Sequence, residues 1–199
     1  MDFYRGDGRG PNNEVLRTKG FTAKPPAVTM TGTQARHHLA GLYSTIVGKY
    51  NFGAKKGQDI SADTNTIGQG LRKETPGNLI ATAMTQAGAY QQTAYFYKIT
   101  IPDNELTFQK IKQNGELAEI ISAQEALTTK AYFLLFNNSS FENADILALC
   151  HGVVDSKEAT FFTGIPAKYI VGYRSGQNVL KNNVPFVPFA GPHRTAVLS

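Results

Sequence analysis

Four short stretches rich in aromatic and β-branched residues constrain the fold of this chain most strongly. They cover residues 94–101, 132–136, 158–162 and 169–173. Turn-forming residues follow the first two: Pro-Asp-Asn at 102–104, and a pair of asparagines at 137–138. Short apolar runs bounded by such residues are typical of β-strands. The core is therefore expected to be built from short strands.

Two segments have the spacing of amphipathic helices. Residues 34–49 repeat apolar side chains along one face, and Thr33 is placed to cap their N-terminus. Residues 117–130 show similar spacing, with a capping signal at 122–125 inside the segment. These patterns predict two helices beside the strands.

The remaining pattern indicates one domain. Residues 51–78 are polar and glycine-rich, which is typical of a long loop, and residues 79–83 predict one more short strand. No internal repeat or low-complexity segment divides the chain. We therefore expect a single α+β domain over residues 1–199, with strands in more than one sheet. The proline-rich tail at 182–199 is expected to wrap the surface.

The composition is globular and excludes several classes of protein. Hydrophobic residues make up 41% of the chain and charged residues 18%, with a dispersed net charge of +5 and no recognisable nucleic-acid module. No apolar run approaches the roughly 20 residues that cross a bilayer. The start lacks a signal-peptide pattern.

Cys150 is the only cysteine, and its apolar neighbours predict a buried thiol. The four histidines show no zinc-binding spacing, so no metal is expected.

An arginine near the start has the surroundings of a binding residue. Residues 4–11 read Tyr-Arg-Gly-Asp-Gly-Arg-Gly-Pro. An aromatic residue, an arginine and then Gly-Asp-Gly indicate a strand end that delivers a guanidinium to a tight turn. A guanidinium is a planar, permanently charged fork that grips phosphate or carboxylate with two hydrogen bonds. Taken alone, such an arginine is most often a solvated surface residue.

Two later segments make this opening block more specific. Residues 77–83 read Gly-Asn-Leu-Ile-Ala-Thr-Ala and precede the aromatic-rich stretch at 93–99. Residues 156–159 read Ser-Lys-Glu-Ala and precede Thr-Gly-Ile-Pro at 163–166. In this order, the three blocks resemble the mono-ADP-ribosyltransferase toxins of the cholera and pertussis toxin-like branch. That branch has an opening arginine block, a Ser-Thr-Ser strand and a Glu-x-Glu motif.

The resemblance implies a fold and an activity. The implied structure is the ADP-ribosyltransferase-like fold, two small packed β-sheets flanked by helices around an NAD cleft. The implied activity is that of an NAD-dependent toxin or effector domain. Such an enzyme cleaves the bond between nicotinamide and ribose in NAD and transfers ADP-ribose to a macromolecule of a target cell.

The resemblance also implies roles for individual residues. Glu158 takes the place of the catalytic glutamate, and Arg5 that of the NAD-binding arginine. The residues expected beside them are Gly6, Asp7 and Arg9 in the opening loop, Ala81 and Thr82 in the strand motif, and Ser156 before the glutamate. Ala81 lacks the hydroxyl that orients the glutamate in the family. Ser156 stands where arginine-modifying members carry a second carboxylate, so arginine is not the expected acceptor.

The resemblance further implies how such a protein acts. It would be secreted or injected and would work in the cytoplasm of a target cell, without a membrane partner. Its acceptor would be a macromolecule, more readily a protein than a nucleic acid, and an immunity or delivery partner would accompany it. Two alternatives stay open. The first is an NAD glycohydrolase, in which water replaces the acceptor. The second is a binding module that has kept the fold and lost the chemistry.

Overall fold

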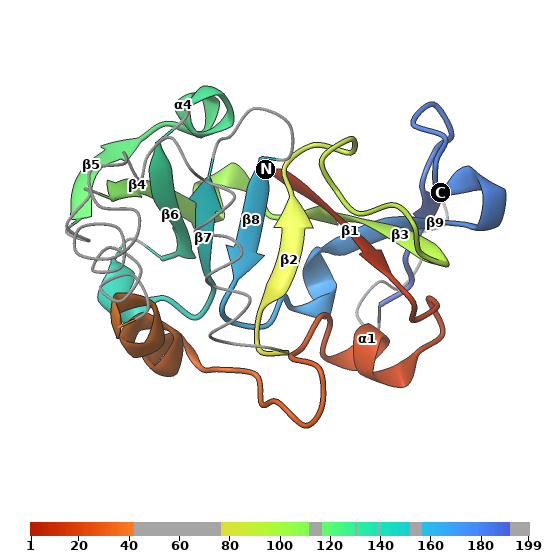
Figure 1. Ribbon diagram of the computed structural model, residues 1–199, viewed down its shortest axis with the longest axis horizontal. Coiled ribbons are helices and arrows are strands. Elements are labelled where there is room, and N and C mark those ends of the chain that lie inside the picture. The colour runs from red at the N-terminus through yellow and green to blue at the C-terminus, as the bar shows by residue number, and fades with distance from the viewer. Residues whose placement is uncertain (42–76, 112–116, 130, 139, 152–156, 192–199) are drawn as a thin grey trace, which may run out of the picture.

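The computed structural model of the protein describes residues 1–41, 77–111, 117–129, 131–138, 140–151 and 157–191 (Figure 1). Two short helices, α1 (Glu14–Thr18) and α4 (Ala123–Thr128), accompany a further helical segment at residues 32–41. The strands in the described residues are β1 (Asp2–Asp7), β2 (Ile80–Ala83), β3 (Tyr95–Thr100), β4 (Leu106–Ile111), β5 (Leu117–Ile121), β6 (Tyr132–Asn137), β7 (Leu147–His151), β8 (Glu158–Phe161), β9 (Ile170–Ser175) and β10 (Val187–Pro188).

These strands form one antiparallel sheet in the order β10-β9-β3-β1-β2-β8-β7-β6-β4-β5. The predicted α+β class is confirmed, but the expectation of two separate sheets is wrong. The two halves of the sheet meet where β1 pairs with β2, and only one residue pair, Tyr4 with Ala83, joins them there. Figure 1 shows β1, β3 and β9 slanting away from β2, β8, β7 and β6.

One large core lies on a face shared by both halves of the sheet. Phe3 of β1 and Phe161 of β8 are fully buried and pack edge to face, with ring centroids 5.4 Å apart. Tyr97 of β3 and Phe133 of β6 belong to the same cluster. Since strands from both sides of the β1–β2 junction contribute, the halves pack as a single body.

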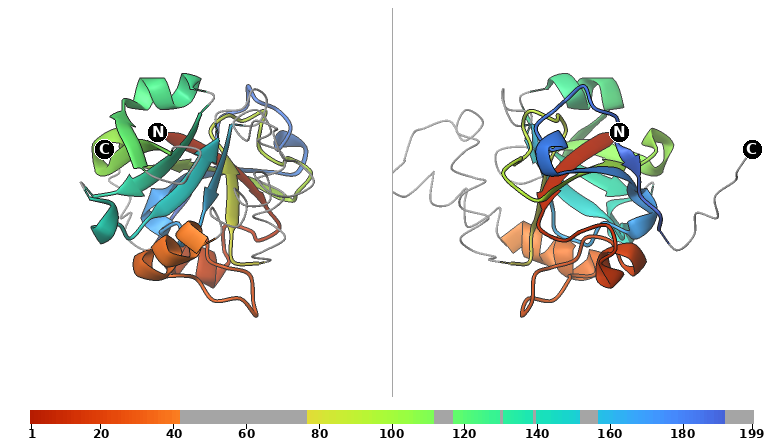
Figure 2. Two further views of the ribbon diagram at one scale, coloured as in Figure 1. Left: turned by 60° about the vertical axis from the view of Figure 1, so that its left-hand side comes forward. Right: turned by 90° about the vertical axis from the view of Figure 1, so that its right-hand side faces the viewer.

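The central strands are buried on both faces. Along β6, Phe133 and Leu135 point into the large core, while the alternate residues Tyr132, Leu134 and Phe136 enter a second cluster. Residues 32–41 cover that second cluster with Ala35 and Leu39. Burial on both faces explains why this stretch is apolar throughout. Figure 2 shows α4 at one end of the strands, with α1 and residues 32–41 at the opposite end.

The helix predicted over residues 117–130 is only partly correct. Ser122 caps a helix as expected, since its hydroxyl accepts a hydrogen bond of 3.0 Å from the Glu125 backbone. However, the helix is the short α4, and the preceding residues form β5, which pairs with β4. The β-branched Ile120 and Ile121 favour this edge strand over a longer helix.

Several other predicted elements are found where the sequence indicates them. Strands predicted at 79–83, 94–101, 132–136, 158–162 and 169–173 correspond to β2, β3, β6, β8 and β9. Residues 32–41 supply the start of the helix predicted at 34–49, and positions 42–76, which include most of the predicted loop, lie outside the described residues. In the C-terminal segment, β10 pairs with β9 at the sheet edge, and residues 192–199 lie outside the described part.

Cys150 is fully buried in the large core, as its neighbours predicted. Burial raises the pKa of its thiol far above the usual value. None of the helices in the described residues is both long and apolar enough to span a membrane.

The Phe3–Phe161 contact predicts a stability effect. Phe161→Ala removes a fully buried ring from the centre of the shared core and should lower the free energy of unfolding by about 3–5 kcal/mol. Urea denaturation measures this change in the free energy of unfolding. Ile120→Ala, at a side chain that is 65% exposed, is the control and should change stability by about 0.5 kcal/mol or less. Equal effects of the two substitutions would contradict the shared core.

Candidate functional site

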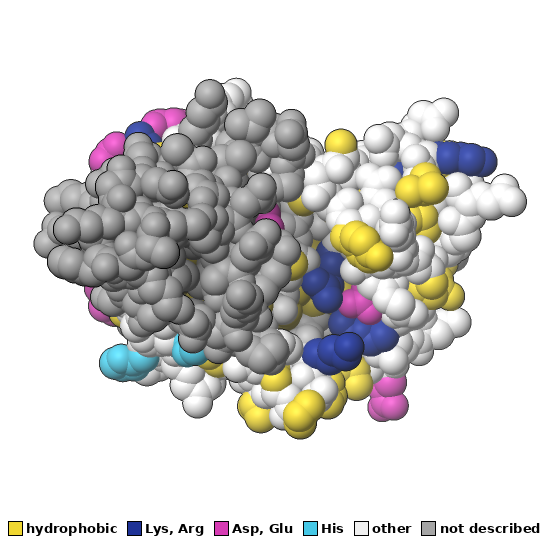
Figure 3. All heavy atoms as spheres, viewed as in Figure 1, with side chains coloured by type: hydrophobic (Ala, Val, Ile, Leu, Met, Phe, Trp, Pro, Cys, Tyr) yellow, Lys and Arg dark blue, Asp and Glu magenta, His cyan; other side chains and the backbone are white. Residues whose placement is uncertain are grey.

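A pocket of about 320 Å³ opens where the two halves of the sheet meet. It is lined by Tyr4, Arg5, Gly6, Ala81, Thr82, Gly88, Ala89, Tyr90 and Glu158. Five of the residues that the sequence predicted for the site therefore lie around one cavity: Arg5, Gly6, Ala81, Thr82 and Glu158. Figure 3 shows basic side chains gathered beside acidic ones over the β1–β2 junction.

Register places Glu158 and its neighbours on one face of the sheet. Ala81 of β2 lies directly opposite Thr160 of β8, and Ala83 lies opposite Glu158. Residues opposite one another, and residues two apart along a strand, share a face. This face also carries Leu149 of β7, which faces Thr160 in the ladder and belongs to the apolar second cluster. The polar site therefore begins where that cluster ends.

Thr160 supplies a hydroxyl to Glu158. Its Oγ1 donates a hydrogen bond of 3.1 Å to Oε1 of Glu158, and the threonine is only 4% exposed. The sequence-based prediction did not single out Thr160. The available signal was its position two residues after the glutamate on a strand, which puts both side chains on the same face.

Thr82 and Ser156 are the hydroxyl-bearing residues that the sequence predicted beside the glutamate. The Thr82 hydroxyl donates to the backbone carbonyl of Ala159 over 2.7 Å and so ties β2 to β8. By strand alternation, Thr82 lies on the opposite face from Ala81 and Ala83. Ser156 lies outside the described residues.

The residue before Glu158 has an unusual backbone. Lys157 has a φ of 40°, in the region that residues other than glycine seldom adopt. Its carbonyl accepts a 2.8 Å hydrogen bond from the Met84 backbone, just after β2 ends. Its Nζ donates to the Leu127 carbonyl in α4. These contacts fix the point at which β8 begins and hence the position of the Glu158 carboxylate.

Arg5 fills the gap left where β1 and β2 diverge. Beyond the single Tyr4–Ala83 pair, Nη1 of Arg5 donates a 2.7 Å hydrogen bond to the carbonyl oxygen of Ala81. Burial lowers the pKa of the Arg5 guanidinium, against the opposing effect of the Asp7 charge. An arginine remains charged at neutral pH even so. Arg5 therefore joins the halves of the sheet and places a positive charge at the pocket.

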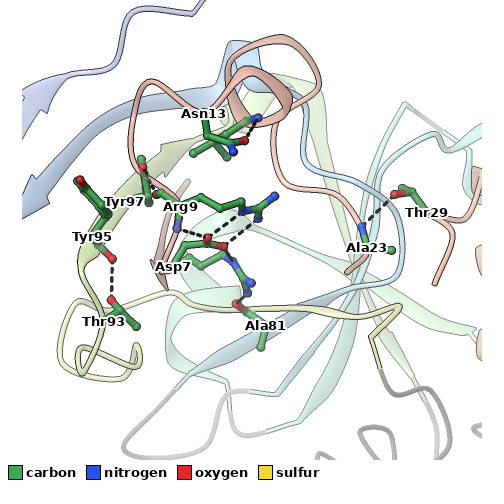
Figure 4. A network of polar contacts seen from close by, with 11 residues as sticks. Asp7, Arg9, Asn13, Ala23, Thr29, Ala81, Thr93, Tyr95 and Tyr97 are labelled. Carbon is green, nitrogen blue, oxygen red and sulfur yellow. Dashed lines mark hydrogen bonds and ion pairs between the residues drawn. The ribbon is translucent and has the colours of Figure 1, made fainter. Parts of the chain in front are cut away.

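Asp7 holds two guanidinium groups in place. Its carboxylate accepts hydrogen bonds of 2.9 Å from Nε and from Nη2 of Arg9, and one of 3.3 Å from Nε of Arg5 (Figure 4). Both guanidiniums also lie near the ring of Phe21, 5.3 and 5.7 Å from its centroid. The loop is anchored further by the Tyr97 hydroxyl, which donates to the Arg9 carbonyl over 2.7 Å. Arg5 lines the pocket and Arg9 is anchored beside it by the shared Asp7 carboxylate, and the two guanidiniums form what we call the cationic side of the pocket.

The charges around Asp7 shift its titration. Burial raises the pKa of the Asp7 carboxyl, but the hydrogen bonds from Arg9 and the charges of Arg5 and Arg9 outweigh it, so the pKa lies below its usual value.

Gly6 lets the pocket wall approach β1 closely. A Cβ atom at Gly6 would lie 2.1 Å from the carbonyl oxygen of Tyr90 and 2.8 Å from the Thr93 hydroxyl. Both atoms belong to the segment that leads into β3. A side chain at position 6 would push this segment away from the pocket.

Comparison of the sequence with models of known protein families finds no match, and comparison with curated proteins finds none either. Among the described residues, no group of three or more histidine, cysteine, aspartate or glutamate side chains is arranged to hold a metal ion.

The Asp7 network predicts a pH-dependent stability difference. Asp7→Asn removes the charge that holds Arg5 and Arg9, and should lower the free energy of unfolding at pH 7 by about 1–3 kcal/mol. The pKa of the Asp7 carboxyl is lower in the folded state than in the unfolded state, where it is about 4. The contribution of Asp7 to the free energy of unfolding is therefore complete above that unfolded-state pKa, and it is lost as the pH falls through the folded-state pKa. Urea denaturation of both proteins at pH 7 and pH 3 measures the change. Asp145→Asn, at an exposed side chain, is the control. A difference that stays constant with pH would rule out this role of the charge.

Proposed function

We propose that this protein is an NAD-dependent mono-ADP-ribosyltransferase. One observation carries the proposal: Arg5, the Ala81–Thr82 strand and Glu158, which come from three distant parts of the sequence, line a single pocket. These are the segments that resemble the arginine, strand and glutamate motifs of the cholera and pertussis toxin-like enzymes.

The proposed reaction requires a carboxylate beside the ribose. The bond between ribose C1 and the nicotinamide nitrogen breaks, and its electron pair leaves with the nicotinamide. The sugar becomes cation-like in the transition state, and a fixed carboxylate stabilises that charge. An acceptor then forms a bond to C1 and loses a proton. Glu158 is the carboxylate that lines the pocket.

The cationic side of the pocket suits the diphosphate of NAD. Hydrogen bonds to described residues occupy Nε and Nη1 of Arg5, and Nε and Nη2 of Arg9. Each guanidinium thus has one terminal nitrogen without a partner among the described residues, and two such donors can serve one diphosphate. The cavity volume is at the lower end of the usual range for small-molecule sites, so we place the nicotinamide riboside inside and the diphosphate along the arginines.

Thr160 takes the orienting role in this proposal. In the family, a serine of the Ser-Thr-Ser strand orients the glutamate, and here that strand carries Ala81. Thr160 lies opposite Ala81, on β8, and donates a hydrogen bond to Glu158 on the same strand. A hydroxyl is therefore available to the carboxylate, supplied by the strand that carries the carboxylate.

The proposed acceptor is a macromolecule of a target cell, modified through a side chain other than arginine. Ser156 precedes Glu158 at the position where arginine-modifying enzymes carry a second carboxylate. A hydroxyl there does not deprotonate an incoming guanidinium. We propose a protein acceptor and a secreted or injected toxin that acts in the target cytoplasm.

Release of nicotinamide from NAD tests the proposal directly. Wild-type protein should release nicotinamide, and Glu158→Gln should reduce the rate by about 10²–10⁴-fold, because a neutral amide does not stabilise the sugar cation. The variant should still be stabilised thermally by NAD, since the arginines are untouched. Glu142→Gln, at an exposed carboxylate, is the matched control and should leave the rate unchanged.

The same assay separates the alternatives. Transfer of labelled ADP-ribose from NAD to a protein in target-cell lysate supports the transferase. Release that depends on Glu158 without transfer identifies a glycohydrolase. Thermal stabilisation by NAD without any release of nicotinamide identifies the binding module. If NAD neither stabilises the protein nor releases nicotinamide, all three hypotheses are wrong.

Thr160 has its own test within this reaction. Thr160→Val keeps the shape but removes the hydrogen bond to Glu158, and should lower kcat about 5- to 30-fold with little change in KM, equivalent to about 1–2 kcal/mol. Thr160→Ser should keep most of the activity. Ala81→Ser, added to the valine variant, returns a hydroxyl to the same face and should restore part of kcat. Similar losses in the serine and valine variants would show that the hydroxyl has no orienting role.

A further inference from the structure

The outer wall of the pocket is a segment without regular secondary structure. Gly88, Ala89 and Tyr90 line the cavity, and residues 84–92 form turns and irregular backbone between β2 and β3. Tyr90 is 65% exposed, so this wall is at the surface. Ladder hydrogen bonds hold the β2 and β8 sides of the pocket, whereas the wall depends on other contacts.

Gln86 connects parts of the wall through hydrogen bonds. Its backbone carbonyl accepts hydrogen bonds from the Ala89 backbone over 3.3 Å and from the Gln91 side chain over 2.6 Å. Its own side-chain oxygen, Oε1, accepts a 2.9 Å hydrogen bond from Nη1 of Arg174 on β9. The turn that shapes the wall is therefore tied to a strand that does not touch the pocket.

Arg174 is buried and uses its donors to connect separate segments. The residue is 3% exposed, and its guanidinium carbon lies 4.0 Å from the centroid of the Phe186 ring. Nη2 donates to the carbonyl of Asn182 over 3.1 Å, while Nε has no partner among the described residues. A buried charge is costly unless its hydrogen bonds are made. Displacement of either segment would therefore leave the guanidinium less satisfied.

A small apolar cluster reinforces this connection. Ala89 of the wall packs with Tyr4 and Phe96 of the sheet and with Val179, and Phe186 packs against the same cluster. The wall thus rests on the C-terminal segment at residues 179–186 as well as on β1 and β3.

We infer that Arg174 is a positioning residue, which acts through Gln86 to hold the outer wall of the pocket in place for the nicotinamide riboside. The identity of the ligand in this inference rests on the proposed function. The hydrogen bond from Arg174 to Gln86, which we call the tether, is independent of that function. Because Glu158 and Thr160 are on β8, which is separated in the sheet from β9 by β3, β1 and β2, loss of the bond between Arg174 and Gln86 should weaken NAD binding more than it slows the chemical step.

Arg174→Met tests the inference, because methionine retains apolar packing against Phe186 but does not bond to Gln86. The expected result is a five- to tenfold rise in KM for NAD, with kcat changed less than twofold. Hydrogen exchange of residues 84–92 should be faster, with exchange in β8 unchanged. Gln86→Met removes the same bond from its half-buried partner, and the double variant should have the KM of either single variant. Arg36→Met removes a guanidinium bond to the Ala144 carbonyl; it is the matched control because neither residue lines the pocket.

The outcomes separate the tether from the proposed function. Unchanged exchange in residues 84–92 for both Arg174→Met and Gln86→Met would overturn the tether, whatever the stability of the variants. Faster exchange with unchanged KM in an active protein would overturn the positioning role. Faster exchange in a protein whose wild type does not turn over NAD would support the tether and reject the proposed function.

Discussion

The contact between Arg5 and the Ala81 carbonyl is the interaction on which the arrangement of the site depends. A ten-stranded sheet that relies on one backbone pair at its middle has an intrinsic weak point. The guanidinium bridges the strands where their backbones separate, and Asp7 fixes its direction. The divergence of β1 from β2 makes room for a pocket, and the bridging side chain places a positive charge in its lining, which also contains the Glu158 carboxylate. Structural support and a positive charge at the pocket thus come from the same residue.

The position of the carboxylate follows from how the sheet is covered. Over β6 and β7, the second apolar cluster covers one face, with the help of residues 32–41. On the same face, β8 carries Glu158 and Thr160 instead of apolar side chains, while its other face keeps Ala159 and Phe161 in the core. One strand therefore secures the fold with one set of side chains and presents the candidate chemistry with the alternate set.

The sequence predicted those features that depend on local pattern. The apolar run of β6, the aromatic run of β3 and the cap at Ser122 were recognisable because each is encoded within a few residues. The segment of β5 combines helical spacing of its apolar residues with the β-branched Ile120 and Ile121, and the pairing with β4, which a local pattern does not show, decides for the strand. The union of all strands in one sheet and the hydrogen bond between Arg174 and Gln86 depend on contacts between distant segments. The Thr160 hydrogen bond is local, but it is formed only once residues 158–161 are a strand, because strand alternation places Thr160 and Glu158 on the same face. Without its long-range contacts, Arg174 is an ordinary residue of a strand.

The strand order also has a consequence for how the molecule assembles. Neighbours such as β6 and β7 are close in sequence and can pair early, whereas β1, β2 and β8 meet only after long stretches of chain have been brought together. Closing such loops is entropically costly, and non-local pairing is slow. The pocket is bounded by these late-meeting strands, so partly folded chains can hold hairpins but no binding cavity. The pocket should therefore form in a late, cooperative step of folding and not gradually as the secondary structure forms.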